Sequence, residues 1–203
     1  PYVDMTRITR PDFRRNTARR VNINRLAAAL NGEDGGIPIR CLHVHACNPV
    51  ASVCNQHGIL RGLRDPELFT VVHERFLTDT ARHADIILPA TFSVEHADFY
   101  SSYGYSSFGT AYKVIPAPGE CKSNWDIFRL LAQAMGYTDS FFRRTEEELM
   151  AELLDHPLPA LRRLGPEQAD ILRQGGMIST PFADHTAWNT PSGKIEIINH
   201  NVP

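Results

Sequence analysis

Two polar side chains that could bind a nucleotide lie directly after apolar runs of the sequence. Asn48 follows the run 39–46, and Glu74 follows the run 68–73. The carboxylate of Glu74 could accept two N–H donors from a guanine edge or the hydroxyls of a ribose, or it could cap a helix or pair with an arginine. The amide of Asn48 could contact a base or the backbone, or it could be a turn residue before a proline.

A second group, Glu95, His96 and Asp98, could perform acid–base chemistry. We favour the alternative that these residues brace a loop. The sequence has no nucleophile elbow, no Walker loop and no GxGxxG motif. We therefore expect side chains at strand ends to hold any bound nucleotide.

Cysteine and histidine residues between positions 41 and 57 could suggest a metal centre. The chain is too long to need a disulfide framework, so we predict reduced thiols at all four cysteines. They are Cys41, Cys47, Cys54 and Cys121. His43 and His45 alternate with apolar residues as in a strand, and no Cys-x2-Cys or His-x3-His pair accompanies them. The spacing favours packed side chains over a metal site.

The elements that must position these residues follow an α/β pattern. Short apolar runs at 39–46, 68–73 and 85–89 are typical of strands buried in a parallel sheet. Apolar spacing and end signals predict helices at 21–30, about 53–63, 77–84, 123–135, 145–154 and 166–174. We predict an α/β fold, a Rossmann-like parallel sheet flanked by helices, with an irregular C-terminal connection.

Two further segments carry weaker signals. Residues 91–118 are rich in Ser, Tyr and Gly, which predicts a long functional loop or an irregular β excursion. Residues 190–198 read as a turn leading into a strand, and no partner strand follows them. We therefore expect the chain to be a fragment, and Pro1 to mark a processing boundary.

Composition excludes several classes of protein. The 203 residues are 42% hydrophobic and 22% charged with a net charge of −2, which is ordinary for a globular domain. No apolar run approaches the roughly 18 residues of a membrane span. We expect the arginine-rich segment 1–21 to be solvated or docked, and we predict no nucleic-acid partner and no membrane span. The compartment is not determined, although reduced thiols favour the cytoplasm over the periplasm.

Four segments taken together resemble the molybdopterin-dependent oxidoreductases of the dimethyl sulfoxide reductase superfamily. They are His43–Ser52, Leu68–Ala90, Pro118–Phe128 and Thr190–Glu196. The second segment matches the family block almost throughout, and the resemblance covers about residues 20–200. It implies the second of two dinucleotide-binding α/β domains, with a basic segment at 1–21, a dinucleotide-cofactor-binding domain at 22–155 and a linker at 156–203 toward a further domain.

The resemblance also implies which residues hold the guanosine end of a molybdopterin guanine dinucleotide. Asn48 occupies the turn near the dinucleotide. His73 and Glu74 form the strand-end pair where an acidic residue meets the guanine, and Thr78 opens the helical turn just past it. His96 stands where some members have a basic residue, and Asn124 stands where many have Asp.

For the whole protein, the resemblance implies an oxidoreductase that transfers oxygen atoms or electrons at molybdenum or tungsten. The metal ligand, and any [4Fe-4S] cluster, would lie outside this segment, so the fragment alone is expected to be inactive. Its expected partners are other domains of the same parent chain and an electron-transfer subunit. The alternative is a free-standing α/β nucleotide-binding or interaction module without metal chemistry.

Overall fold

The computed structural model describes residues 19–101, 106–155, 166–179, 190 and 192–195. No helix in these ranges is long and apolar enough to cross a membrane. The predicted strand at 195–198 and most of the basic segment 1–21 lie outside the described residues. Arg19, at the end of that segment, pairs with Asp34 and donates to the Ile37 carbonyl at 2.7 Å. This arginine is therefore docked on a turn.

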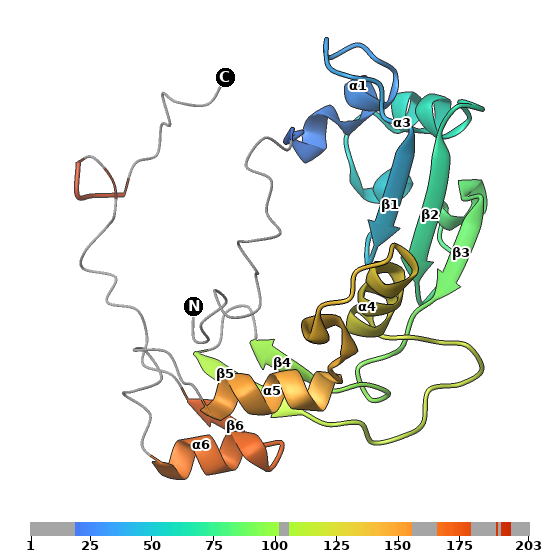
Figure 1. Ribbon diagram of the computed structural model, residues 1–203. Coiled ribbons are helices and arrows are strands. Elements are labelled where there is room, and N and C mark those ends of the chain that lie inside the picture. Colours follow the sequence, from blue (N-terminus) through green and yellow to red (C-terminus); the bar gives the residue numbers. More distant parts are fainter. Residues whose placement is uncertain (1–18, 102–105, 156–165, 180–189, 191, 196–203) are drawn as a thin grey trace.

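The predicted parallel sheet is confirmed. Strands β1 (Cys41–His45), β2 (Phe69–Glu74) and β3 (Ile86–Pro89) pair in the order β1-β2-β3, and both pairings are parallel. Their carboxyl ends point toward the part of the molecule that contains helix α4 and a second sheet (Figure 1). The segments that follow β1, β2 and β3 therefore meet at one edge.

Helices pack beside the amino ends of the strands. Helix α1 (Leu26–Leu30) follows the 3-10 turn η3 (Ile23–Arg25), and it packs against α3 (Gln56–Leu63). The buried cluster that they share with the sheet comprises Ala27, Leu30, Val50, Ile59, Leu63 and Leu68. A helix not predicted, α2 (Pro49–Ser52), begins directly at the proline, because proline is favoured at the first helical position.

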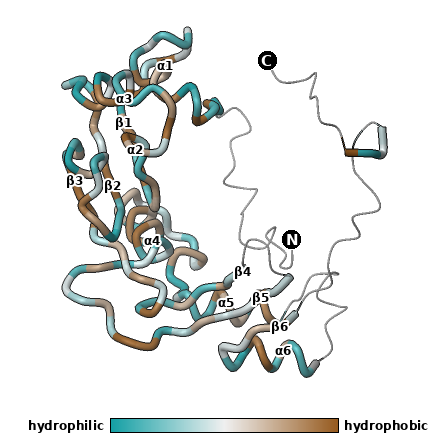
Figure 2. Tube along the Cα trace, turned by 180° about the vertical axis from the view of Figure 1, so that it is seen from behind, coloured by the Kyte–Doolittle hydropathy of each residue, from teal (hydrophilic) through white to brown (hydrophobic). Residues whose placement is uncertain are grey.

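The prediction of a buried strand at 85–89 is wrong about its burial. Ile86 and Ile87 of β3 are 43% and 45% exposed. An apolar run shows that a strand can be buried, but it does not show what covers it, and β3 has a paired neighbour on one side only among the described strands. Figure 2 shows the hydrophobic stretches along this part of the chain. The helical turn after β2 is also shorter than predicted, reduced to η4 (Ala81–His83).

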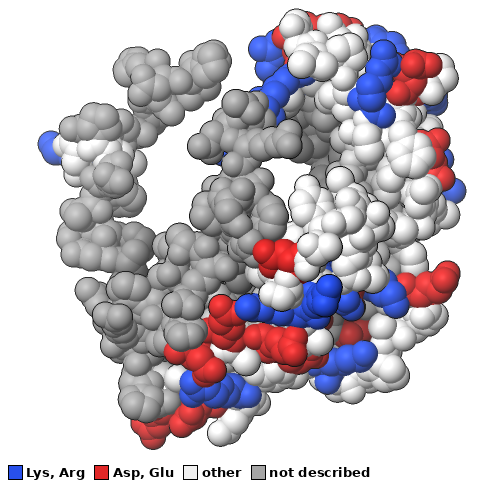
Figure 3. All heavy atoms as spheres, viewed as in Figure 1, with Lys and Arg blue, Asp and Glu red and all other residues white. Residues whose placement is uncertain are grey.

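A second sheet occupies part of the predicted loop. Strands β4 (Asp98–Ser101) and β5 (Ser107–Ala111) pair antiparallel, and β6 (Met177–Ser179) adds to β5. The sequence analysis missed β6. Helices α5 (Glu146–Asp155) and α6 (Pro166–Arg173) contact this sheet, and the shared core comprises Phe108, Leu154, Leu172 and Ile178. Acidic and basic side chains are mixed over this part of the surface (Figure 3).

Helix α4 (Asn124–Ala134) joins the two sheets, and its predicted ends are confirmed. The Ser123 hydroxyl accepts from the Asp126 N–H at 3.1 Å, and Gly136 follows the helix with a positive φ of 84°. None of its residues is fully buried. The capping box of α5 is also present, because Thr145 and Glu148 exchange hydrogen bonds of 3.2 and 2.8 Å. A short 3-10 turn, η5 (Ser140–Arg143), lies between these helices.

The contact between α1 and α3 gives the first prediction. A Cβ on Gly62 would lie 2.5 Å from the Leu30 Cβ, so alanine does not fit there without a shift of backbone. Helix propensity alone would make Gly62→Ala stabilising by about 1 kcal/mol. We expect the steric term to dominate, with a loss of roughly 1–3 kcal/mol. Urea unfolding measures this, Gln56→Ala on the same helix is the control, and a gain in stability would contradict it.

Candidate functional site

A cavity of about 200 Å³ lies at the carboxyl edge of the parallel sheet, and we call it the strand-tip pocket. Its walls come from the end of β2, the segment after β3, the start of β4 and the first turn of α4. It is lined by Ala46, His73, Glu74, Arg75, Ala90, Thr91, Ser93, His96, Asp98, Tyr100 and Asn124. The fold thus brings together His73, Glu74, His96 and Asn124 of the six candidate residues.

The other two candidates, Asn48 and Thr78, do not line the strand-tip pocket. The Asn48 Oδ1 accepts from both the N–H and the hydroxyl of Thr80, at 3.1 and 2.8 Å. The Thr80 hydroxyl in turn accepts from the Val50 N–H at 3.1 Å. The Thr78 hydroxyl accepts from the Ala81 N–H at 3.1 Å and so opens η4, as expected. Both side chains fasten turns in this structure, and their roles toward a dinucleotide stay predictions.

His73 is fully buried at the end of β2 and lines the pocket. Its Nε2 lies 3.1 Å from the Lys122 carbonyl, which can only accept, so this nitrogen carries the proton and donates it. Burial lowers the pKa of His73, which keeps the ring neutral. Its Nδ1 is buried, and a side-chain contact with Asn124 partly offsets the lowering of the pKa of the ring.

Glu74 lies where its carboxylate could either bind a nucleotide or pair with an arginine. Its side chain is largely buried, Oε1 accepts from the Arg75 N–H at 2.7 Å, and the Arg75 Nε lies 3.9 Å away. An ion pair this long, with a half-exposed arginine, adds little stability. The carboxylate therefore places a negative charge in the pocket. Its contact with Arg75 leaves it able to accept further hydrogen bonds.

The residues predicted to brace the loop after β3 do so. The Glu95 Oε2 accepts from the Phe92 N–H at 2.9 Å, and the His96 Nδ1 lies 2.8 Å from the Thr91 hydroxyl. The His96 Nε2 is 4.0 Å from the Asp98 carboxylate. His96 is thus held in the pocket wall by the hydroxyl on one side and faces the carboxylate on the other.

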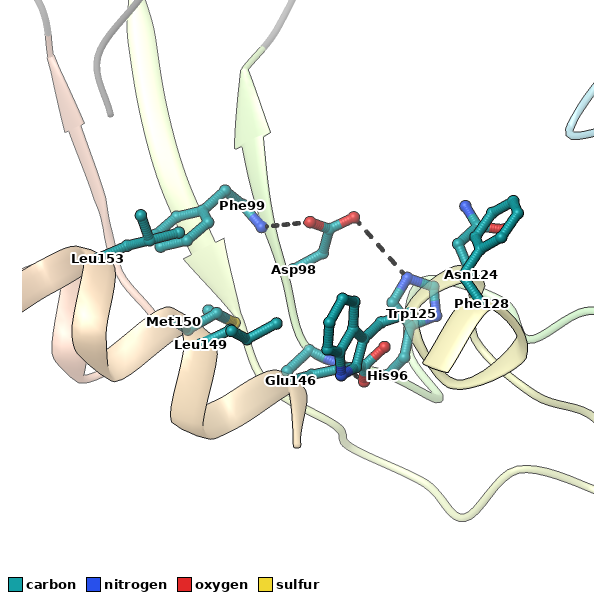
Figure 4. A pocket seen from close by; sticks show the side chains of 11 residues that line it. His96, Asp98, Phe99, Asn124, Trp125, Phe128, Glu146, Leu149, Met150 and Leu153 are labelled. Atoms are coloured by element: carbon teal, nitrogen blue, oxygen red, sulfur yellow. Dashed lines mark hydrogen bonds and ion pairs between the residues drawn. The ribbon is translucent and has the colours of Figure 1, made fainter. Parts of the chain in front are cut away.

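A neighbouring cavity of about 330 Å³ lies between α4, α5 and β4 (Figure 4). It shares His96, Asp98 and Asn124 with the strand-tip pocket. Glu146 lines it and accepts from the Ala97 N–H at 3.3 Å, and burial raises the pKa of this carboxyl. The sequence analysis missed Glu146 as a pocket residue, because its place in the first turn of a helix indicated only a favourable helix-dipole contact.

Histidines cover the face of the sheet beneath α4. The ring of Phe128 on α4 lies 5.3 Å from the ring of His43 and 5.6 Å from that of His45. Burial and the nearby His45 and His73 lower the pKa of His43. Among the described residues, no three Cys, His, Asp or Glu side chains are grouped to hold a metal ion. The four cysteines are free thiols.

Comparison with known proteins identifies the family. The profile of the molybdopterin oxidoreductase family matches residues 17–134. The protein named "Probable oxidoreductase YoaE" from Bacillus subtilis (strain 168) is 43% identical over 151 residues, which are 74% of this chain and 22% of that protein. The dimethyl sulfoxide/trimethylamine N-oxide reductase of Rhodobacter capsulatus is 33% identical over 179 residues, covering 76% of this chain and 21% of that protein.

A solved structure shares the fold. Acetylene hydratase from Pelobacter acetylenicus matches with a TM-score of 0.63 and 23% sequence identity, over 87% of this chain and 24% of that chain. The chain therefore belongs to the molybdopterin oxidoreductase family, and the resemblance to the dimethyl sulfoxide reductase superfamily is confirmed. It spans about a fifth of the length of these curated relatives.

The contacts of Asn48 with Thr80 give a prediction about stability. Asn48→Ala leaves the buried N–H and hydroxyl of Thr80 without their acceptor. We expect the free energy of unfolding to fall by roughly 1–3 kcal/mol, the cost of an unsatisfied buried donor. Urea denaturation measures this, and Asn24→Ala, at an exposed asparagine contacted by a thiol at 3.9 Å, is the control. Equal stability of the two variants would show that the Thr80 contacts are not needed.

The histidine face predicts a loss of stability in acid. The folded state lowers the pKa of both His43 and His73 below the ordinary value of 6.5. At these two histidines the unfolded chain therefore binds more protons, so the stability that they contribute is fully present above about pH 6.5 and is lost as the pH falls through their lowered pKa values. Chemical unfolding at pH 7.5 and pH 5 measures this. His43→Leu should flatten the pH dependence, Gln56→Ala should not, and an unchanged slope in His43→Leu contradicts the assignment.

Proposed function

We propose that this chain holds the guanosine end of a molybdopterin guanine dinucleotide, within a larger oxidoreductase that carries molybdenum or tungsten. The observation that supports the proposal most is the meeting of Glu74, His73 and Asn124 in one pocket at the carboxyl edge of a parallel sheet. Ligands bind at this edge in open α/β sheets. Membership of the molybdopterin oxidoreductase family supports the cofactor class.

The donors and acceptors in the pocket suit a guanine base. Guanine presents N–H donors at its N1 and N2 positions, and the Glu74 carboxylate accepts such donors. The Asn124 amide in the pocket wall can either donate or accept, and it contacts the ring of the buried His73. The residues present therefore fit the base end of the cofactor.

The size of the pocket supports the same assignment. About 200 Å³ is below the roughly 300–1,000 Å³ of a site that encloses a whole small ligand. The pocket is therefore suited to one end of a long cofactor. The pterin and the metal would lie beyond it, against domains outside this sequence.

The division of roles follows from these contacts. When bound, the cofactor supplies the redox chemistry, in which the full-length enzyme transfers oxygen atoms or electrons at the metal. This chain supplies binding and orientation: Glu74 fixes the base edge, His73 holds the segment before α4 through the Lys122 carbonyl, and His96 holds the loop after β3 in place. The metal ligand, any [4Fe-4S] cluster and the contacts to an electron-transfer subunit lie outside the residues assigned here.

Glu74 provides the test of the proposal. Glu74→Gln, in the enzyme that carries this chain, replaces an ionised acceptor with a group that also donates. We expect cofactor affinity to fall roughly 10- to 150-fold, the equivalent of about 1.5–3 kcal/mol for a hydrogen bond to a charged group. The readouts are metal content and the guanosine monophosphate released from the purified protein by acid hydrolysis.

The control is Glu67→Gln, an exposed glutamate that lies 3.5 Å from Arg40 just before β2. It should leave both contents unchanged. Full metal and guanine content in Glu74→Gln would remove Glu74 from the site. Absence of guanine from the unmodified enzyme would contradict the proposal itself.

A further inference from the structure

The cavity of about 330 Å³ between α4, α5 and β4, which we call the interhelical cavity, is not used by the proposed function. Its volume falls within the roughly 300–1,000 Å³ of sites that enclose a small ligand. Most of its wall is apolar, and the side chains that provide this part are Phe99, Trp125, Phe128, Leu149, Met150 and Leu153. The cavity is therefore large enough to bury the apolar body of a small molecule.

The polar part of the wall carries negative charge. The carboxyl groups of Asp98 and Glu146 line the cavity, and among its described lining residues there is no lysine and no arginine. Asp98 is the more exposed of the two: its side chain is 58% exposed, and one of its oxygens accepts from the Phe99 N–H at 2.7 Å. Water therefore screens the charge of Asp98 more than that of Glu146.

Glu146 is a half-buried carboxyl group that lacks a cationic partner. It accepts from the Ala97 N–H at 3.3 Å, and within the described part of the chain it forms no ion pair with a lysine or an arginine. Burial raises the pKa of this carboxyl, because its charged form loses contact with water. A cation that entered the cavity would offset this cost, since buried charges are favourable when they are paired.

The charged and apolar parts of the cavity are separate. In Figure 4 the side chains of Phe99 and Leu153 stand apart from those of His96 and Glu146. The indole of Trp125 is held in the wall, because its Nε1 donates to the Arg144 carbonyl at 2.8 Å. Indole is the aromatic side chain that attracts a cation most strongly. The cavity thus offers a carboxylate and an indole to a cation, and an apolar surface to the rest of the ligand.

We propose that the interhelical cavity binds a small organic cation, a primary amine with an apolar body, whose ammonium group pairs with Glu146. An ammonium group donates charge-assisted hydrogen bonds to a carboxylate, and the apolar body packs against Phe99, Leu149 and Leu153. The site goes beyond the proposed function and does not depend on the cofactor. The other occupant to consider is a basic side chain from a part of the enzyme outside this sequence. The ligand is favoured because α4, α5 and β4 of this chain already enclose a volume of the right size.

The experiment titrates the enzyme that carries this chain with two probes, benzylamine and benzyl alcohol, and follows binding by ligand-observed NMR. The probes share the same apolar body, but at pH 7.5 benzylamine is a cation and benzyl alcohol is neutral. We expect benzylamine to bind about tenfold more tightly, because only the cation gains a charged hydrogen bond.

Three variants locate the site. Glu146→Gln keeps the shape of the side chain and an acceptor for the Ala97 N–H, but it removes the charge. We expect it to raise the dissociation constant of benzylamine about tenfold and to leave that of benzyl alcohol unchanged. Glu147→Gln, at the exposed neighbour that does not line this cavity, is the matched control and should change neither constant. Leu149→Phe reduces the apolar space and should weaken the binding of both probes.

Each contrary outcome overturns the proposal in a different way. Equal affinity of the unmodified enzyme for the two probes would overturn the cationic class of ligand. Unchanged benzylamine affinity in both Glu146→Gln and Leu149→Phe would place the amine elsewhere. Absence of binding of both probes to the unmodified enzyme would show that another part of the enzyme fills the cavity. None of these results concerns Glu74 or the guanine content, so the proposed function is tested separately.

Discussion

The arrangement of the site depends on how Lys122 pairs with the end of β3. Its N–H donates to the Pro89 carbonyl at 3.0 Å, and its own carbonyl accepts from the Thr91 N–H at 3.1 Å and from the His73 ring. Three short contacts thus fix the start of α4 against the tips of β2 and β3. Asn124 reaches the same pocket as Glu74 because it follows Lys122 by two residues. The rest of α4 is held by partly buried contacts, among them Phe128 against His43 and the Trp125 Nε1 that donates to the Arg144 carbonyl at 2.8 Å.

The sequence predicted the parts of the fold that local signals determine. The parallel strands, the Ser123 cap and the capping box of α5 all follow from residue types at fixed spacing, and the structure contains them. Strand β6 was missed because three residues after a pair of glycines carry no periodicity of their own; β6 exists through its pairing with β5. The exposure of β3 could not be predicted either, because burial depends on what packs against a strand.

The site was predictable to a similar degree. Glu74 and Asn48 were singled out from their positions after strands, and only Glu74 lines the pocket. His73, His96 and Asn124 came from the resemblance to a family, since nothing in their local sequence brings residues so far apart into one wall. Asn48 shows the limit of such reasoning: its side-chain Oδ1 accepts from Thr80, a contact across 32 positions that no local pattern reveals. Glu146 was missed because the packing of α5 against β4 brings it beside the pocket.

The exposed edge of β3 has a consequence for how this sheet can grow. The unpaired backbone of an edge strand is a template on which another strand can add. Here the template is short: β3 has four residues and ends at Pro89, which has no N–H to offer, and the next position, Ala90, already bridges Lys122. An added strand could therefore extend along Ile86–Leu88 and no further. The same proline that ends β3 thus confines an added strand to the part of this edge away from the pocket.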